Sequence, residues 1–115
     1  MLDLNNLYWE EKQNIDNIYR AAHDLWGENV VFGDIEVIES PYPEFDLPMK
    51  LFDKVGILLN YDRSALDIGV PKDGRYVLMS EFTDKPFVRG MKATQPENLI
   101  SNFRVLDEVA KKLIV

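Results

Sequence analysis

Apolar side chains at both ends of the chain recur at the spacing of an amphipathic helix. In residues 4–26 they follow one another mostly at intervals of three and four, which predicts a first helix that ends at Gly27. Residues 99–113 repeat this spacing, and Thr94 with Glu97 has the pattern of a capping box before them. The chain is therefore expected to begin and to end in a helix.

Between these helices the apolar positions alternate, as they do in strands that bury one face. Residues 29–39 form the first alternating segment. Residues 55–61 and 66–70 predict a hairpin at the centre of a sheet, because a short polar turn separates them. Residues 75–82 predict the next strand, and residues 87–91 predict a short edge strand.

The segment 40–48 interrupts the alternation with three prolines and predicts an exposed, ordered loop. The strand connections are too short for parallel crossovers, so the strands are expected to be antiparallel. The apolar side of this meander is the only large surface on which two amphipathic helices can pack. The sequence therefore predicts one α+β domain over residues 1–115, a two-layer sandwich in which an antiparallel sheet of about five strands carries the N-terminal and C-terminal helices on one face.

Composition fits a folded domain that needs no covalent or metal support. The chain has 115 residues, of which 46% are hydrophobic, and it has no cysteine, which excludes disulfides, thiolate zinc sites and cysteine nucleophiles. No apolar run approaches the roughly 20 residues that span a bilayer, and the first residues lack a secretion signal. We expect a cytoplasmic protein that needs no cofactor and does not enter a membrane.

The net charge of −7 is distributed unevenly along the chain. The first 48 residues carry eleven acidic and two basic side chains, whereas residues 49–115 carry nine acidic and eleven basic ones. No lysine or arginine lies between Arg20 and Lys50. A negative field of this kind attracts a basic surface and repels nucleic acid and anionic lipid, so the expected partner is a basic protein.

The candidate binding residues lie in this acidic part of the chain. Tyr42 and Phe45 are large aromatic residues in the proline-stiffened segment, a combination typical of binding hot spots, although both rings could instead cover the open edge of the core. The one-sided acidity around them favours binding. The predicted partner-binding set is Asp34, Glu36, Glu39, Tyr42, Glu44, Phe45 and Asp46.

Catalytic chemistry has weaker support in the sequence. Asp34 and Glu36 would share one face of a strand, and with Asp67 they could hold Mg²⁺ in a small metal-dependent enzyme. No glycine-rich phosphate loop or general base accompanies them, and the single histidine, His23, suits the C-terminal end of a helix as a cation. We therefore expect neither a metal site nor catalytic residues.

A protein-binding function is the expectation that remains. Its most concrete form is an inhibitor that neutralises a basic toxin, such as a nuclease, by covering the toxin's positive surface. In size, acidity and lack of catalytic motifs the chain resembles the small bacterial immunity proteins, a resemblance of general properties that assigns no residue a role. The alternative among binding functions is a homo-oligomeric adaptor, in which residues 87–91 or 113–115 pair with a second copy of the chain. For the partner-binding function we expect a monomer or a weak homodimer.

Overall fold

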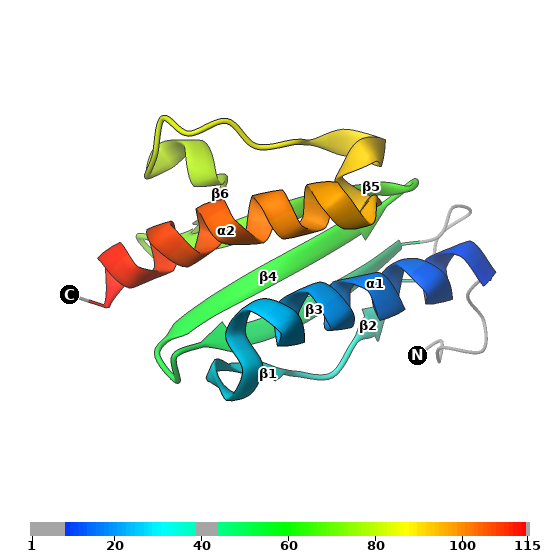
Figure 1. Cartoon of the computed structure of the whole chain (residues 1–115), viewed down its shortest axis with the longest axis horizontal. Helices are drawn as coiled ribbons and strands as arrows, with labels where there is room; N and C mark the ends of the chain where they lie inside the picture. The colour runs from blue at the N-terminus through cyan, green and yellow to red at the C-terminus, as the bar shows by residue number, and fades with distance from the viewer. Residues whose placement is uncertain (1–8, 39–43, 115) are drawn as a thin grey trace.

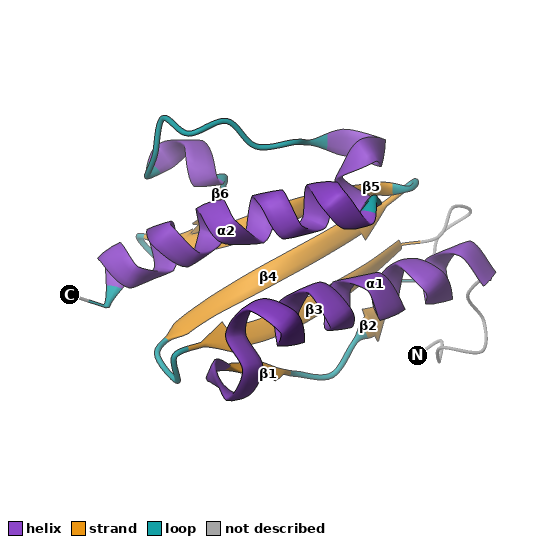
Figure 2. Ribbon diagram, in the orientation of Figure 1, coloured by secondary structure: helices purple, strands orange, loops and turns teal. Residues whose placement is uncertain are grey.

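The structure is a computed structural model that describes residues 9–38 and 44–114. Two helices lie side by side on one face of a six-stranded antiparallel sheet (Figures 1 and 2), so the predicted two-layer α+β fold is confirmed. The helices are α1 (Trp9–Trp26) and α2 (Pro96–Leu113), and the strands are β1 (Val30–Phe32), β2 (Glu36–Val37), β3 (Glu44–Leu51), β4 (Val55–Asp62), β5 (Ala65–Lys72) and β6 (Arg75–Val77). Short 3₁₀ helices occupy Gly27–Asn29, Met79–Glu81 and Gly90–Thr94.

The strand order is β1-β3-β4-β5-β6, and β2 also pairs with β3, so β1 and β2 lie along the same edge. Strands β3 and β4 pair over their full eight residues and form the centre of the sheet with β5. Neither α1 nor α2, nor any shorter helix among the described residues, combines the length and apolar character needed to cross a bilayer.

The core lies between the helices and the sheet because every second strand residue points toward them. Phe45 and Tyr61 stack in adjacent strands with ring centroids 4.7 Å apart. Trp26 of α1 packs 5.1 Å from Phe103 of α2, and its indole nitrogen donates a hydrogen bond of 3.0 Å to Asp107. The buried strand residues on this face are Val30, Val37, Phe45, Leu47, Met49, Leu51, Val55, Ile57, Leu59, Tyr61, Leu66, Ile68 and Val70.

The largest difference from the sequence prediction concerns the segment 40–48. Residues 39–43 lie outside the described part of the chain, but residues 44–48 belong to β3, so the predicted loop is wrong there. Pro48 is tolerated in a central strand because its nitrogen points away from β4. Its carbonyl accepts a hydrogen bond of 2.9 Å from Gly33, and the nitrogen and carbonyl of one residue in an antiparallel strand point to the same side, here the break between β1 and β2. The missing N–H therefore removes no hydrogen bond between β3 and β4.

The predicted strand 29–39 is two short strands separated by a bulge. Phe32 pairs with Met49 and Glu36 pairs with Asp46, so three residues of the edge lie opposite two residues of β3. A bulge of this kind shifts the alternation of side chains by one position. Residues on either side of it therefore do not follow the predicted period of two.

The predicted strand 75–82 is shorter than expected, and the predicted strand 87–91 is absent. β6 ends at Val77, and residues 87–91 form no strand. Instead, the buried side chain of Asn102 in α2 binds both backbone groups of Val88, with two hydrogen bonds of 2.8 Å. These bonds satisfy the backbone polar groups that a neighbouring strand would otherwise pair.

The start of α2 differs from the predicted capping box. Gln95 is the N-cap residue and makes no side-chain cap bond, while the hydroxyl of Thr94 donates to the carbonyl of Met91 at 3.0 Å. Pro96 occupies the first turn, where its lack of an N–H costs nothing. The helix was predicted correctly, but its capping interaction was not.

Candidate partner-binding site

The sheet face opposite the helices is the open face. Its side chains are those that alternate with the core positions, and no helix of the described residues packs on it (Figure 1). They are exposed or half-buried, and Val31 on β1 and Tyr76 on β6 are 64% and 53% exposed. This face is therefore accessible to a partner.

A polar row crosses the open face perpendicular to the strands. The strand register places Glu36 of β2 beside Asp46 of β3, Asp46 beside Asn60 of β4, and Asn60 beside Asp67 of β5. The Asn60 amide donates a hydrogen bond of 2.7 Å to Asp46, and Arg89 donates to both oxygens of Asp67 at 3.2 and 3.4 Å. We call Glu36, Asp46, Asn60 and Asp67 the acidic row.

Negative charge is uncompensated at one end of this row. Glu44 lies two residues from Asp46 on the same face of β3, diagonally across from Glu36. Its register partner in β4 is Asp62, which pairs with Arg63 at 3.8 Å. Within the described ranges, no lysine or arginine lies within 4.0 Å of the carboxylates of Glu36, Glu44 or Asp46. We call Glu36, Glu44 and Asp46 the acidic corner.

Six of the described cations form ion pairs elsewhere on the domain. The ion pairs that join described residues are Arg20–Asp16, Arg63–Asp62, Lys72–Glu81, Lys85–Glu108, Arg89–Asp67 and Lys111–Asp107. Each of these carboxylates is at least partly balanced by its neighbour. No ion pair between described residues includes Glu36, Glu44 or Asp46, and Glu36 and Asp46 lie directly opposite each other.

The structure brings together only part of the predicted binding set. Glu36, Glu44 and Asp46 share the open face, whereas Asp34 is exposed in the bulge between β1 and β2. Phe45 is fully buried against Tyr61, so its ring covers the core and is not a surface residue. Glu39 and Tyr42 lie outside the described residues.

Sequence reasoning missed the contributions of β4 and β5. Asn60 and Asp67 extend the row because Arg63 and Ser64 form a two-residue hairpin loop, in which both have positive φ values, 53° and 69°. Such a loop fixes the register of the flanking strands. The sequence predicted a polar turn at this place. Had the turn been assigned as a two-residue loop, the register would have placed Asn60 opposite Asp67.

The metal-site alternative does not match the geometry. The bulge removes the strand period on which the alignment of Asp34 with Glu36 depended. Asp67 is three strand spacings from Glu36, about 14 Å, which is far beyond the reach of one ion. Over residues 9–38 and 44–114, no group of three potential metal ligands converges.

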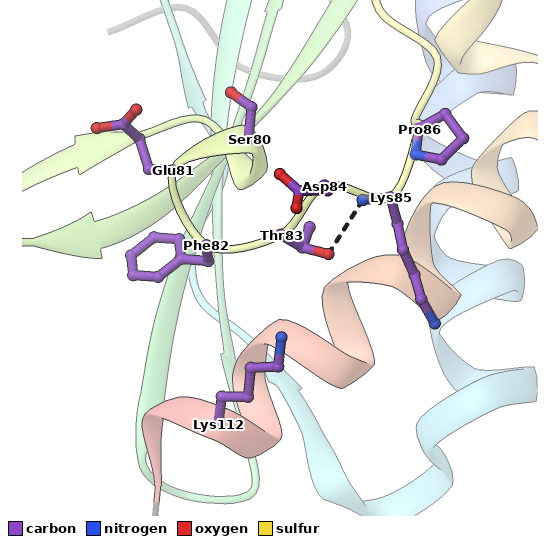
Figure 3. A pocket seen from close by; sticks show the side chains of 8 residues that line it. All are labelled: Ser80, Glu81, Phe82, Thr83, Asp84, Lys85, Pro86 and Lys112. Atoms are coloured by element: carbon purple, nitrogen blue, oxygen red, sulfur yellow. Dashed lines mark hydrogen bonds between the residues drawn. The ribbon is translucent and has the colours of Figure 1, made fainter.

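A depression of about 720 Å³ lies away from the acidic row, between the loop before α2 and the C-terminal turns of that helix. Figure 3 shows Lys112 rising from α2 toward the loop that carries Thr83, whose hydroxyl accepts a hydrogen bond of 3.2 Å from the Lys85 amide. The Lys85 ammonium group is paired with Glu108 at 2.6 Å. His23 lies near Phe32 instead, so the hydroxyls here have no histidine as a base.

A buried polar group lies on the helix side of the sheet, behind the acidic row. Asn14 of α1 donates a hydrogen bond of 3.3 Å to the hydroxyl of Tyr61. Burial raises the pKa of Tyr61, and the negative charge of nearby Glu11 raises it further, although hydrogen bonds from Ser64 and Asn14 oppose this. One oxygen of Glu11, a residue only 4% exposed, has no hydrogen-bond partner among the described residues. This group affects stability, since neither Tyr61 nor Glu11 reaches the open face.

Comparison with models of protein families, with curated proteins and with solved structures finds no match to this chain.

Proposed function

We propose that this chain binds a basic protein through the acidic corner and the open face around it. The observation that carries the proposal is the side-by-side placement of Glu36, Glu44 and Asp46 without a neighbouring described cation. Like charges placed opposite each other in a sheet reduce stability, and no ion pair between described residues offsets the charges of Glu36 and Asp46. A basic partner that neutralises these side chains would remove their repulsion, and this would favour binding.

The most concrete version of this function is the neutralisation of a basic toxin. An acidic surface that mimics the charge of a nucleic-acid backbone would attract a nuclease quickly and cover its substrate-binding surface. Complementary charge mainly increases the rate of association, whereas buried apolar contacts slow release. Neutralisation of a toxin requires both fast association and slow release. The open face offers carboxylates beside half-buried apolar residues such as Leu58.

The proposal is tested by charge reversal with a matched control. The double variant Glu36→Lys, Glu44→Lys changes two exposed or half-buried carboxylates of the acidic corner. The control Asp84→Lys with Glu97→Lys makes the same charge change in the loop before α2 and in the first turn of α2. The chain and its variants would be assayed with basic proteins encoded beside it, by binding at several salt concentrations and by rescue of growth on co-expression.

We expect the unchanged chain and the control to bind and to protect growth, with affinity falling as salt rises. The corner variant should lose most of its affinity through slower association. Equal binding by the corner variant and the control, or affinity that is independent of salt, would refute the proposal. Binding without growth rescue would leave the binding function and reject its toxin-neutralising version.

A further inference from the structure

An apolar row lies beside the acidic row on the open face. Pro48 of β3 is in register with Leu58 of β4, and Leu58 is in register with Gly69 of β5. Tyr76 continues the row, since a Cβ atom built on Gly69 would lie 3.0 Å from the Cβ and 3.3 Å from the ring of Tyr76. We call Pro48, Leu58, Gly69 and Tyr76 the apolar lane.

The apolar lane and the acidic row are parallel and close together. Each crosses the strands in steps of about 4.8 Å, and they are two residues apart along each strand, about 7 Å. The face therefore presents an apolar stripe flanked on one side by carboxylates. An α-helix about 10 Å in diameter would cover both rows at once, and about ten of its residues would span the 14 Å of the acidic row.

We propose that the segment of the partner bound here is an amphipathic α-helix that lies across the strands. Its apolar side contacts the apolar lane, and lysine or arginine side chains along one flank contact the acidic corner. This inference rests on the proposed function, because it assumes that the open face binds a basic protein, and it adds the form of the bound segment.

The spacing and the charge of the rows favour this occupant. Residues three and four apart on a helix are about 5–6 Å from each other, close to the distance between neighbouring strands, so one flank can offer a cation at each step. The two ends of the row also differ in charge: among the described residues Glu36 has no ion-pair partner at one end, whereas Asp67 is paired with Arg89 at the other. The positive N-terminal end of a helix is best placed over Glu36 and its negative C-terminal end near Arg89.

Two synthetic peptides of identical composition test the inference. Both contain only leucine, lysine and alanine; in the first the leucines form one helical stripe with lysines along one flank, and in the second the order is scrambled so that no stripe exists. Affinity would be measured by titration, and the bound surface mapped by amide chemical shifts of the whole chain.

We expect the patterned peptide to bind about tenfold more tightly and to shift amides of β3, β4 and β5. Leu58→Ser should reduce this preference by about fivefold and leave the scrambled peptide unaffected. The control Ile100→Ser changes an exposed apolar residue of α2, on the other layer, and should have no effect. Urea unfolding of both variants would verify that each remains folded.

The outcomes separate this inference from the proposed function. Equal binding of the two peptides, weakened alike by Glu36→Lys with Glu44→Lys, would overturn the helical occupant and leave the binding of basic proteins standing. Binding that the corner variant does not weaken would contradict both. Amide shifts confined to α1 and α2, or no binding of the patterned peptide, would also overturn the helical occupant.

Discussion

Glu36→Gln is expected to make the protein more stable. Glu36 lies directly opposite Asp46, is exposed, and has no cation of the described residues beside it. Glutamine keeps the size and shape of the side chain and removes its charge. The change therefore tests whether the charges of the acidic corner lower the stability of the isolated protein, which is the physical basis of the proposed function.

The size of the effect follows from the separation of the two charges. Paired residues of adjacent strands are about 5.5 Å apart, at which two unit charges in water repel by about 0.8 kcal/mol. Measured effects of like charges at such positions are about 0.2–1 kcal/mol, so we expect the free energy of unfolding to rise by roughly 0.5–1 kcal/mol. With an m-value of about 1.5 kcal/mol/M, the urea midpoint should rise by roughly 0.5 M.

The assay is urea unfolding at low ionic strength and again in about 1 M NaCl, where the Debye length is only about 3 Å and the gain should nearly disappear. Glu97→Gln is the matched control, because it makes the same chemical change in the first turn of α2. There the charge favours the helix, so its removal should lower stability slightly. No gain from Glu36→Gln at low salt, or a gain that persists undiminished in high salt, would refute the reasoning.

Three further predictions concern the core and the open face. Phe45→Ala should lower the free energy of unfolding by about 3–5 kcal/mol in urea or thermal unfolding, since the ring is fully buried on Tyr61, whereas a cost under about 1 kcal/mol would show that the ring is not in the core. Burial raises the pKa of Tyr61 above its usual 10.0, so the folded protein holds the phenolic proton more tightly than the unfolded chain and loses stability as pH rises above about 10 through the folded-state pKa. Tyr61→Phe should flatten that alkaline fall and, because Asn14 loses its partner, cost about 1–2 kcal/mol at neutral pH; an unchanged alkaline slope in unfolding measured from pH 8 to 11 would count against this assignment. Gly69→Ala should cost about 1–3 kcal/mol in urea unfolding, because the new methyl group would press on Tyr76 at 3.0 Å, and a neutral result would show that Tyr76 does not lie over this position.

Local patterns were sufficient for most of the elements. The three- and four-residue spacing around Ile18 and Phe103 predicted both helices, and the alternation around Leu59 and Ile68 predicted the central hairpin. These patterns worked because amphipathic periodicity reports directly on which face an element buries. The same local reasoning treated Pro48 as a strand breaker, since the sequence does not reveal which way a backbone nitrogen points.

The candidate site could be predicted only in part. Glu36, Glu44 and Asp46 were identified from the scarcity of bases around them, and the structure places all three on one face. Phe45 was a candidate for the same surface, but the strand alternation turns it into the core. A single residue of register decides between these two outcomes, because neighbouring side chains of a strand point in opposite directions.

The sequence by itself determined the two helices, the central hairpin, the layering of helices on an antiparallel sheet, and the separation of charge along the chain. These properties depend on composition and on periods of two and 3.6 residues, which are local. Only the tertiary structure decided that β3 is a central strand, that Asn60 and Asp67 extend the acidic row, and that the apolar lane runs beside it. Such relations depend on the pairing of distant strands, and pairing is set by bulges, turn geometry and packing against the helices, none of which any single segment contains.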